Sequence, residues 1–250
     1  MRNGGDRAVI KGVLFDKDGT LIDFFSLWLK AATETVPLFL KMNGLEYTEE
    51  LEKYVLEAIG VSDHKVDPAG ALAYKSYEEI AEDITEALRK KGIPLQTAEV
   101  RCQIEDLFNQ SVTGENAEYK QLADVGEMAD SLKRKGIYVG LATADTLDSA
   151  QNCMDILGVT EKFDYIGADD GKRKPKPEPD MFREFQEAFH LQPEEIAVVG
   201  DSYNDIVFAK RNGGIAIGVL SGVSRLEDFR GEADYIIGSI DEFVNIVDKI

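Results

Sequence analysis

Hydrophobic residues form short continuous runs at the start of the chain and again throughout its second half. The first run, residues 8–15 (AVIKGVLF), is apolar on both faces and is followed at once by Asp-Lys-Asp-Gly. Such a run is typical of a strand in the centre of a parallel sheet. From residue 125 onward, helix-like segments alternate with strand-like runs at 137–143, 163–168, 196–200, 215–220 and 233–237. This alternation indicates βαβ units and predicts an α/β fold with a Rossmann-like parallel sheet.

Residues 23–115 show only helical spacing of their apolar positions. Predicted helices cover about 24–42, 48–59, 76–91 and 97–109, and the third begins with a capping-box pattern, Ser76 with Glu79. Pro37 could divide the first helix in two. We therefore expect a Rossmann-like core, residues 1–22 and 116–250, that is interrupted after its first strand by an all-helical domain, residues 23–115.

The composition limits the kinds of partner. The chain has 47 acidic and 28 basic residues and a net charge of −19, which argues against a nucleic acid or an anionic membrane as the partner. The longest uncharged stretch, 212–224, has 13 residues and is too short to span a bilayer. The two cysteines lie far apart and show no metal-binding spacing, as expected for reduced thiols in a cytoplasmic protein.

Polar clusters follow several of the predicted strands. In open parallel sheets, ligands bind beyond the carboxyl ends of the strands. Asp16 and Asp18 follow the first strand, and Asp201 and Asp205 follow the strand at 196–200. Carboxylates gathered at one sheet edge repel each other, and a hard cation with oxygen ligands relieves that repulsion. Mg²⁺ suits such a site, because it accepts carboxylates, waters and a substrate phosphate.

Donors for an anion stand at two further strand ends. Thr143 offers a hydroxyl, and backbone N–H groups from Ala144 onward are expected to open a helix, which together make an anion site. Lys174 and Lys176 lie in a proline-stiffened loop, KPKPEP. The chain has no GxxxxGK[ST] loop and only two histidines, both outside these clusters. A carboxylate nucleophile is therefore the favoured chemistry, with Asp16 attacking and Asp18 acting as general acid and base.

Four segments together resemble the motifs of the haloacid dehalogenase superfamily, and most closely its phosphoglycolate phosphatase-like branch. They are DKDGTLID at 16–23, LATAD at 141–145, KPEPDMF at 176–182 and GDSYND at 200–205. The resemblance covers almost the whole chain. It implies a Mg²⁺-dependent phosphatase for a small phosphorylated metabolite, acting through an aspartyl phosphate, with the helical insert as a cap. A monomer or a homodimer is expected.

The resemblance also implies a role for each matching position. Asp16 corresponds to the nucleophile and a metal ligand. Asp18 corresponds to the general acid and base, with its carbonyl on the metal. Thr143 with Ala144, and Lys176 in preference to Lys174, correspond to the catalytic phosphate-binding groups. Asp201 corresponds to a metal ligand, and Asp205 to an acid in or just outside the metal's coordination shell.

Other interpretations remain open. Asp205 could simply cap a helix, Asp145 is expected to do so, and Thr143 could be an ordinary strand residue. A phosphomutase of the β-phosphoglucomutase type would use the same four motifs. A non-catalytic protein that keeps the fold is less favoured, because none of the motifs is broken.

Overall fold

The computed structural model describes residues 9–113, 119–229 and 231–250. The chain divides into two compact units, Met1–Asp23 with Gln121–Ile250 and Phe24–Lys120. The sequence predicts a first boundary between core and insert at residues 22 and 23. The second predicted boundary, at residues 115 and 116, falls outside the described residues. No helix in the described ranges combines the length and apolar character needed to cross a membrane.

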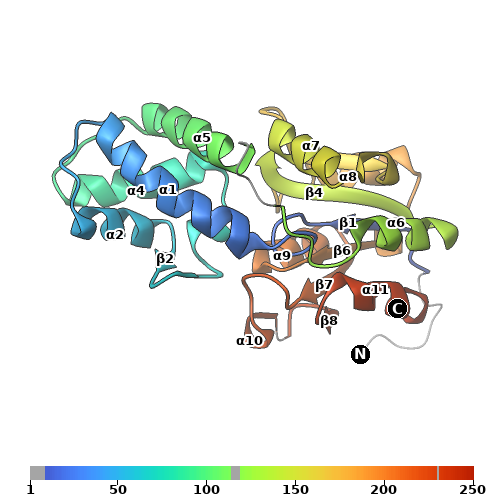
Figure 1. Ribbon diagram of the computed structural model, residues 1–250. Helices are drawn as coiled ribbons and strands as arrows, with labels where there is room; N and C mark the ends of the chain where they lie inside the picture. The colour runs from blue at the N-terminus through green and yellow to red at the C-terminus, as the bar shows by residue number, and fades with distance from the viewer. Residues whose placement is uncertain (1–8, 114–118, 230) are drawn as a thin grey trace. The chain divides into compact units, whose positions relative to one another are not determined.

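The first unit is built on a parallel sheet, as the sequence predicts (Figure 1). Among the described residues, its strand order is β5-β4-β1-β6-β7-β8. The chain runs from β1 outward through β4 to β5, then returns to β6 on the other side of β1. The point where the order reverses therefore lies beside β1, which is where open parallel sheets bind ligands. The strands are β1 (Gly12–Phe15), β4 (Tyr138–Thr146), β5 (Tyr165–Asp169), β6 (Ile196–Gly200), β7 (Ile215–Val219) and β8 (Tyr235–Ile237).

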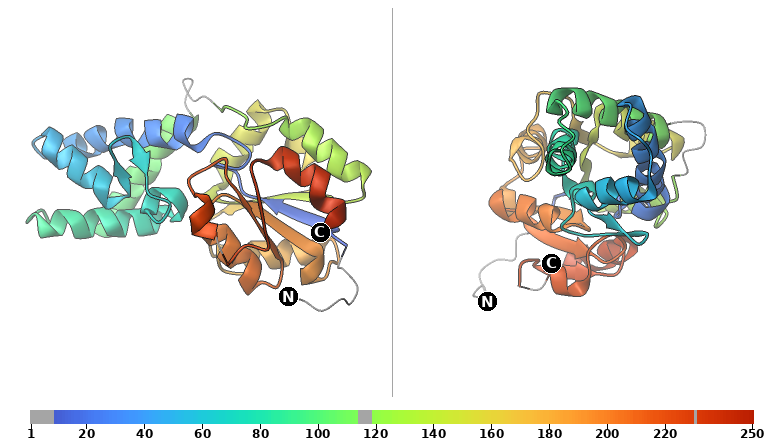
Figure 2. Two further views of the ribbon diagram at one scale, coloured as in Figure 1. Left: turned by 90° about the horizontal axis from the view of Figure 1, so that it is seen from below. Right: turned by 90° about the vertical axis from the view of Figure 1, so that its left-hand side faces the viewer.

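Helices cover both faces of this sheet, which is seen nearly edge-on between them in Figure 2, left. One face packs against α6 (Val125–Arg134), α7 (Leu147–Ile156) and α11 (Ile240–Ile246). The other packs against α8 (Asp180–Ala188), α9 (Tyr203–Arg211) and the short α10 (Leu226–Phe229). Side chains of β1 alternate between the two faces, Val13 and Phe15 toward the first and Leu14 toward the second. This explains why the strand reads as continuously apolar.

The second unit consists mainly of helices. They are α1 (Lys30–Met42), α2 (Glu49–Ala58), α3 (Ala71–Tyr74), α4 (Tyr77–Lys90) and α5 (Thr97–Thr113), and a π-helical turn, Phe25–Leu29, precedes α1. The capping box of Ser76 and Glu79 is formed at the start of α4. One feature departs from the predicted all-helical insert: two-residue strands, β2 (Val61–Ser62) and β3 (Lys65–Val66), pair antiparallel.

Pro37 does not divide α1, which continues through it to Met42. A proline in a helix interior removes one hydrogen bond and costs about 3 kcal/mol. The buried apolar face of α1, which includes Val36, Phe39 and Leu40, offsets this cost, since each such side chain contributes about 1.5–3 kcal/mol on burial. Tertiary packing therefore decides the outcome at this position.

Candidate active site

Three carboxylates from two strand ends meet beside the reversal point of the sheet. Asp16 directly follows β1, Asp201 directly follows β6, and Asp205 lies in the first turn of α9. Phe15 is paired with Val199 across the two strands, so the residues that follow emerge side by side. Asp16, Asp201 and Asp205 are buried, and each offers an oxygen within 4.8 Å of the others. The structure thus brings together three of the residues that the sequence singled out for metal binding.

Lys176 supplies a cation to this cluster. Its Nζ lies 2.7 Å from Asp16 Oδ1 and 2.6 Å from Asp205 Oδ1, and its side chain is buried. Asn204, on α9, donates a hydrogen bond of 3.1 Å to the backbone carbonyl of Lys176, which fixes the loop to that helix. Lys174, in contrast, is exposed. The lysine preferred from the sequence is therefore the one at the carboxylates.

The cluster carries more negative charge than its lysine balances. Burial raises the pKa of Asp16 to about 7, and the charges of Asp205 and Asp18 add to this rise although Lys176 opposes it. Burial, with Asp16 and Asp205, likewise raises the pKa of Asp201 well above its ordinary value. Burial lowers the pKa of Lys176, but the two carboxylates beside it outweigh that effect and leave the pKa raised. Such a carboxylate set becomes stable in ionised form when a divalent cation joins it.

The hydrogen bonds of the cluster indicate which oxygens a cation would use. Asp205 Oδ1 accepts from Lys176, and its Oδ2 accepts from the backbone N–H and the hydroxyl of Ser202. No hydrogen bond from the described residues reaches Asp16 Oδ2 or Asp201 Oδ1. These two oxygens therefore fit a hard cation directly, whereas Asp205 caps α9 through its capping box with Ser202 and also holds Lys176. Asp205 therefore takes part in the cap of α9 and also lies within the carboxylate cluster.

Two glycines make room for Asp201, and neither was predicted from the sequence to do so. A Cβ on Gly222 would lie 1.9 Å from Asp201 Oδ2, and one on Gly19 would lie 2.3 Å from the same oxygen. Gly19 also has a φ of +83°, which favours glycine. The N–H of Val223 donates to Asp201 Oδ2 at 2.7 Å. The loop after β7 therefore shapes the carboxylate cluster, and its glycine-rich sequence was the available signal.

The end of β4 differs from the prediction. The strand continues to Thr146, whose hydroxyl caps α7, so the helix does not start at Asp145 and Ala144 is not at a helix N-terminus. The pairing of β4 with β5 is irregular between Ala142 and Thr146. A bulge of this kind re-aims the side chains within it. Buried Thr143 accepts the N–H of Asp145 at 3.2 Å, which leaves its own hydroxyl proton to donate to a ligand.

Asp145 forms a buried ion pair that the sequence analysis missed. Lys17 Nζ lies 2.5 Å from Asp145 Oδ2 and 3.2 Å from Asp18 Oδ2, and the Lys17 side chain is fully buried. Burial lowers the pKa of Lys17, but Asp145 and Asp18 outweigh it and raise the pKa well above its ordinary value. Asp145 was expected to cap a helix, and this expectation was wrong, because Thr146 holds that position. The sequence signal was the lysine between Asp16 and Asp18, directly after a buried strand.

A family model for haloacid dehalogenase-like hydrolases matches residues 10–213. The chain belongs to this family. A Clostridium perfringens protein that carries the provisional name pyrophosphatase PpaX is 29% identical over 97% of this chain and 99% of its own. A phosphoglycolate phosphatase of Vibrio parahaemolyticus is 27% identical over 95% and 96%. The crystal structure of CbbY from Rhodobacter sphaeroides in complex with phosphate is 26% identical, covers 94% and 96%, and has a TM-score of 0.65.

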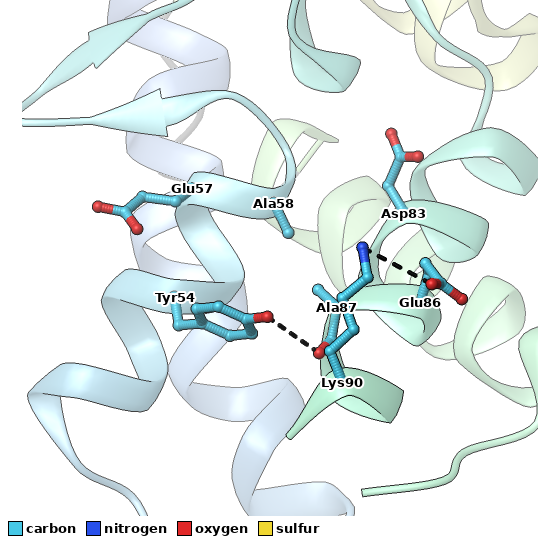
Figure 3. Close-up of a pocket in the computed structure, with 7 residues that line it drawn as sticks. All are labelled: Tyr54, Glu57, Ala58, Asp83, Glu86, Ala87 and Lys90. Atoms are coloured by element: carbon cyan, nitrogen blue, oxygen red, sulfur yellow. Dashed lines mark hydrogen bonds and ion pairs between the residues drawn. The ribbon is translucent and has the colours of Figure 1, made fainter. Parts of the chain in front are cut away.

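The second unit of this haloacid dehalogenase-like hydrolase has a surface pocket of its own, between α2 and α4 (Figure 3). Lys90 pairs with Glu86 at 3.6 Å, and the Tyr54 hydroxyl donates to the Ala87 carbonyl at 3.3 Å. Three carboxylates against one paired lysine disfavour an anion there. The pocket is lined by Tyr54, Glu57, Ala58, Asp83, Glu86, Ala87 and Lys90.

Proposed function

We propose that this hydrolase is a Mg²⁺-dependent phosphatase that cleaves a small phosphate monoester through a phosphoryl-aspartate on Asp16. Phosphoglycolate is the first substrate to test, because a relative at 27% identity is named for that activity. A second relative, at 29% identity, is named a pyrophosphatase, so pyrophosphate belongs in the same panel. Cytoplasmic localisation and a small phosphorylated metabolite as partner form part of the proposal.

The observation that carries this proposal is the position of Lys176. Its ammonium group bridges Asp16 and Asp205, 2.7 and 2.6 Å away, beside Asp201. The ion pair fixes the orientation of the Asp16 carboxylate, and the same ammonium group can attract the oxygens of a phosphoryl group. Together with a divalent cation on the carboxylates, this lysine would give an acidic protein of net charge −19 a local field that accepts an anion.

In the first step, a carboxylate oxygen of Asp16 attacks phosphorus in line with the leaving oxygen, and the O–P ester bond breaks as the acyl phosphate forms. Asp18 donates its proton to the leaving oxygen, so the alcohol departs neutral. Lys176 neutralises charge on the phosphoryl oxygens, and the Thr143 hydroxyl donates a hydrogen bond to one of them. Ala144, which directly follows Thr143 in β4, would offer its backbone N–H to a phosphoryl oxygen.

In the second step, a water molecule attacks the phosphorus of the acyl phosphate. Asp18, now ionised, removes the proton of that water, and the bond between phosphorus and Asp16 breaks to release inorganic phosphate. The free carboxylate of Asp16 and the protonated Asp18 are restored together. One residue thus serves as acid and then as base, which explains why both carboxylates are needed.

Asp16, Asp201 and the carbonyl of Asp18 would hold Mg²⁺, with Asp205 next to them. When bound, the cation polarises phosphoryl oxygens and neutralises developing charge. The predicted insert is proposed as the cap, whose closure would exclude water from the site.

The test is a panel of phosphate esters and pyrophosphate, assayed with Mg²⁺ and with EDTA. We expect release of inorganic phosphate that EDTA stops and Mg²⁺ restores. A folded Asp16→Asn protein should lose activity by more than about 1,000-fold and should not be labelled by a radioactive phosphate ester. Accumulation of an isomerised sugar phosphate in place of free phosphate would instead indicate a phosphomutase. Turnover by Asp16→Asn comparable to that of the wild type would remove the nucleophile assignment.

A further inference from the structure

Lys17 is a buried cation that the proposed mechanism does not use. It stands between Asp16 and Asp18, and its side chain has an exposed fraction of 0%. A lysine in such a place is stable only when a carboxylate neutralises it, because an unpaired buried charge is very costly. Asp145, 128 residues away in the chain, lies at 2.5 Å with its side chain 1% exposed. The pair therefore joins the loop after β1 to the end of β4.

Hydrogen bonds with neighbouring backbone groups fix both residues of the ion pair. Asp145 Oδ1 accepts the N–H of Thr146 at 2.8 Å, and the N–H of Asp145 donates to Thr143 at 3.2 Å. The Lys17 carbonyl accepts N–H groups from Leu21 and Ile22 at 2.9 and 3.1 Å. The ammonium group of Lys17 thus has a fixed place, set by two distant segments. A charge with a fixed place can orient a neighbouring group.

That neighbour is Asp18. Lys17 Nζ lies 3.2 Å from Asp18 Oδ2, and the Asp18 side chain is 14% exposed, more than those of Lys17 or Asp145. We propose that Lys17, anchored by Asp145, is a positioning residue that holds the Asp18 carboxylate where it can reach the leaving oxygen. This inference rests on the proposed function, in which Asp18 is the general acid.

The dependence on the leaving group separates positioning of the acid from a merely structural role. The value of kcat/KM reports phosphoryl transfer to Asp16, the step in which the leaving oxygen takes its proton. An alkyl alcohol needs that proton, whereas nitrophenolate leaves without it. A displaced Asp18 should therefore slow cleavage of an alkyl phosphate far more than cleavage of p-nitrophenyl phosphate. A general loss of structure would slow both equally.

The informative variant is the double substitution Lys17→Met with Asp145→Asn, which removes both charges and leaves neither unpaired. We expect its kcat/KM for glycerol phosphate to fall about 100-fold and that for p-nitrophenyl phosphate to fall less than about tenfold. The single substitution Asp145→Asn keeps Lys17 but removes its anchor, and should give a smaller loss with the same preference. Lys174→Met, at an exposed lysine, is the matched control and should change neither value.

Equal losses for the two substrates, or no loss, in the folded double variant would overturn the positioning role. Should the double variant fail to fold, as judged by circular dichroism, the Asp145→Asn protein decides by the same ratio of losses. Failure of the proposed function is distinguishable, because the wild-type protein would then cleave neither ester.

Discussion

If Asp16 is a metal ligand, as proposed, its carboxyl links proton binding to metal binding. Without a metal, burial raises its pKa from 3.8 to about 7, so the folded protein binds this proton more tightly than the unfolded chain does. The stabilisation is complete below the unfolded value and is lost as the pH rises through about 7. Asp201 shifts in the same direction. Thermal unfolding in EDTA should therefore show a melting temperature that falls between about pH 5 and about pH 8.

Mg²⁺ should reverse this trend, because it takes the place of the protons. We expect the rise in melting temperature caused by Mg²⁺ to grow from about pH 5 to about pH 8. Asp16→Asn is the control, since it removes one of the two carboxyls whose pKa is raised, and should weaken the pH dependence of that rise. A rise of equal size at every pH in the wild-type protein would contradict the assignment of Asp16 as a ligand.

Gly222 tests the metal site without altering any proposed ligand. In Gly222→Ala, the new methyl group would meet Asp201 Oδ2 at 1.9 Å, so the carboxylate must move. We expect a loss of Mg²⁺ affinity of about 10- to 100-fold, the range found when groups that orient metal ligands are changed. Titration of activity against Mg²⁺ concentration measures it.

Gly126→Ala is the matched control for this substitution. Gly126 is the second residue of α6, and an added Cβ there would lie 3.5 Å from its nearest neighbours, Asp124 Oδ1 and the end of the Lys162 side chain. That change should alter the free energy of unfolding by less than about 1 kcal/mol, because Gly126 lies in the first turn of the helix and not in its interior, and should leave the Mg²⁺ requirement unchanged. Equal Mg²⁺ affinities of the two variants would contradict the role of the loop after β7.

At the level of elements, the loop that carries Lys176 depends on α9. Asn204 donates its side-chain amide to the Lys176 carbonyl at 3.1 Å, and Asn212 at the other end of α9 makes a similar bond of 2.8 Å to Phe208. Asn204→Ala should lower kcat/KM by about tenfold, because Lys176 is proposed to bind the phosphoryl group and a small displacement of such a cation is costly. Asn212→Ala should cost stability of about 1 kcal/mol but not activity. Steady-state kinetics and thermal unfolding of both variants check this, and equal activities would contradict it.

Elements with strong local signals could be predicted from the sequence. The strand at Ile196–Gly200 and the capped start of α4 agree with the pattern to the residue, because burial on both faces and the Ser76–Glu79 pair act locally. The start of α7 could not be placed, since Asp145 and Thr146 are both good N-caps. Asp145 pairs with Lys17, a contact between segments that local sequence does not encode. The hairpin of β2 and β3 is too short to show alternation.

At the level of the whole molecule, the strand order explains how far the site could be predicted. One carboxylate oxygen each of Asp16, Asp201 and Asp205 lies within 4.8 Å of the others, because β1 and β6 are neighbours and their carboxyl ends share one edge. The alternation of strands and helices implies such an edge, so the sequence could indicate which carboxylates meet there. The loop with Gly222 and Val223 reaches Asp201 from β7. The glycine content of the loop is visible in the sequence, but no residue spacing predicts its contact with Asp201, which depends on how the loop packs.

The net charge of −19 should affect how an anionic substrate reaches this edge. The Debye length is about 30 Å at 0.01 M salt and about 8 Å at 0.15 M, so an approaching phosphate ester feels the repulsion of the whole surface only at low salt. The ammonium group of Lys176 is buried and is screened far less. We therefore expect kcat/KM to rise about two- to fivefold between these concentrations of potassium chloride at constant Mg²⁺. The rise should be steeper for phosphoglycolate, which carries an additional carboxylate, than for p-nitrophenyl phosphate. A fall in kcat/KM with increasing salt would contradict this prediction and would mean that local positive charge governs the approach of the substrate.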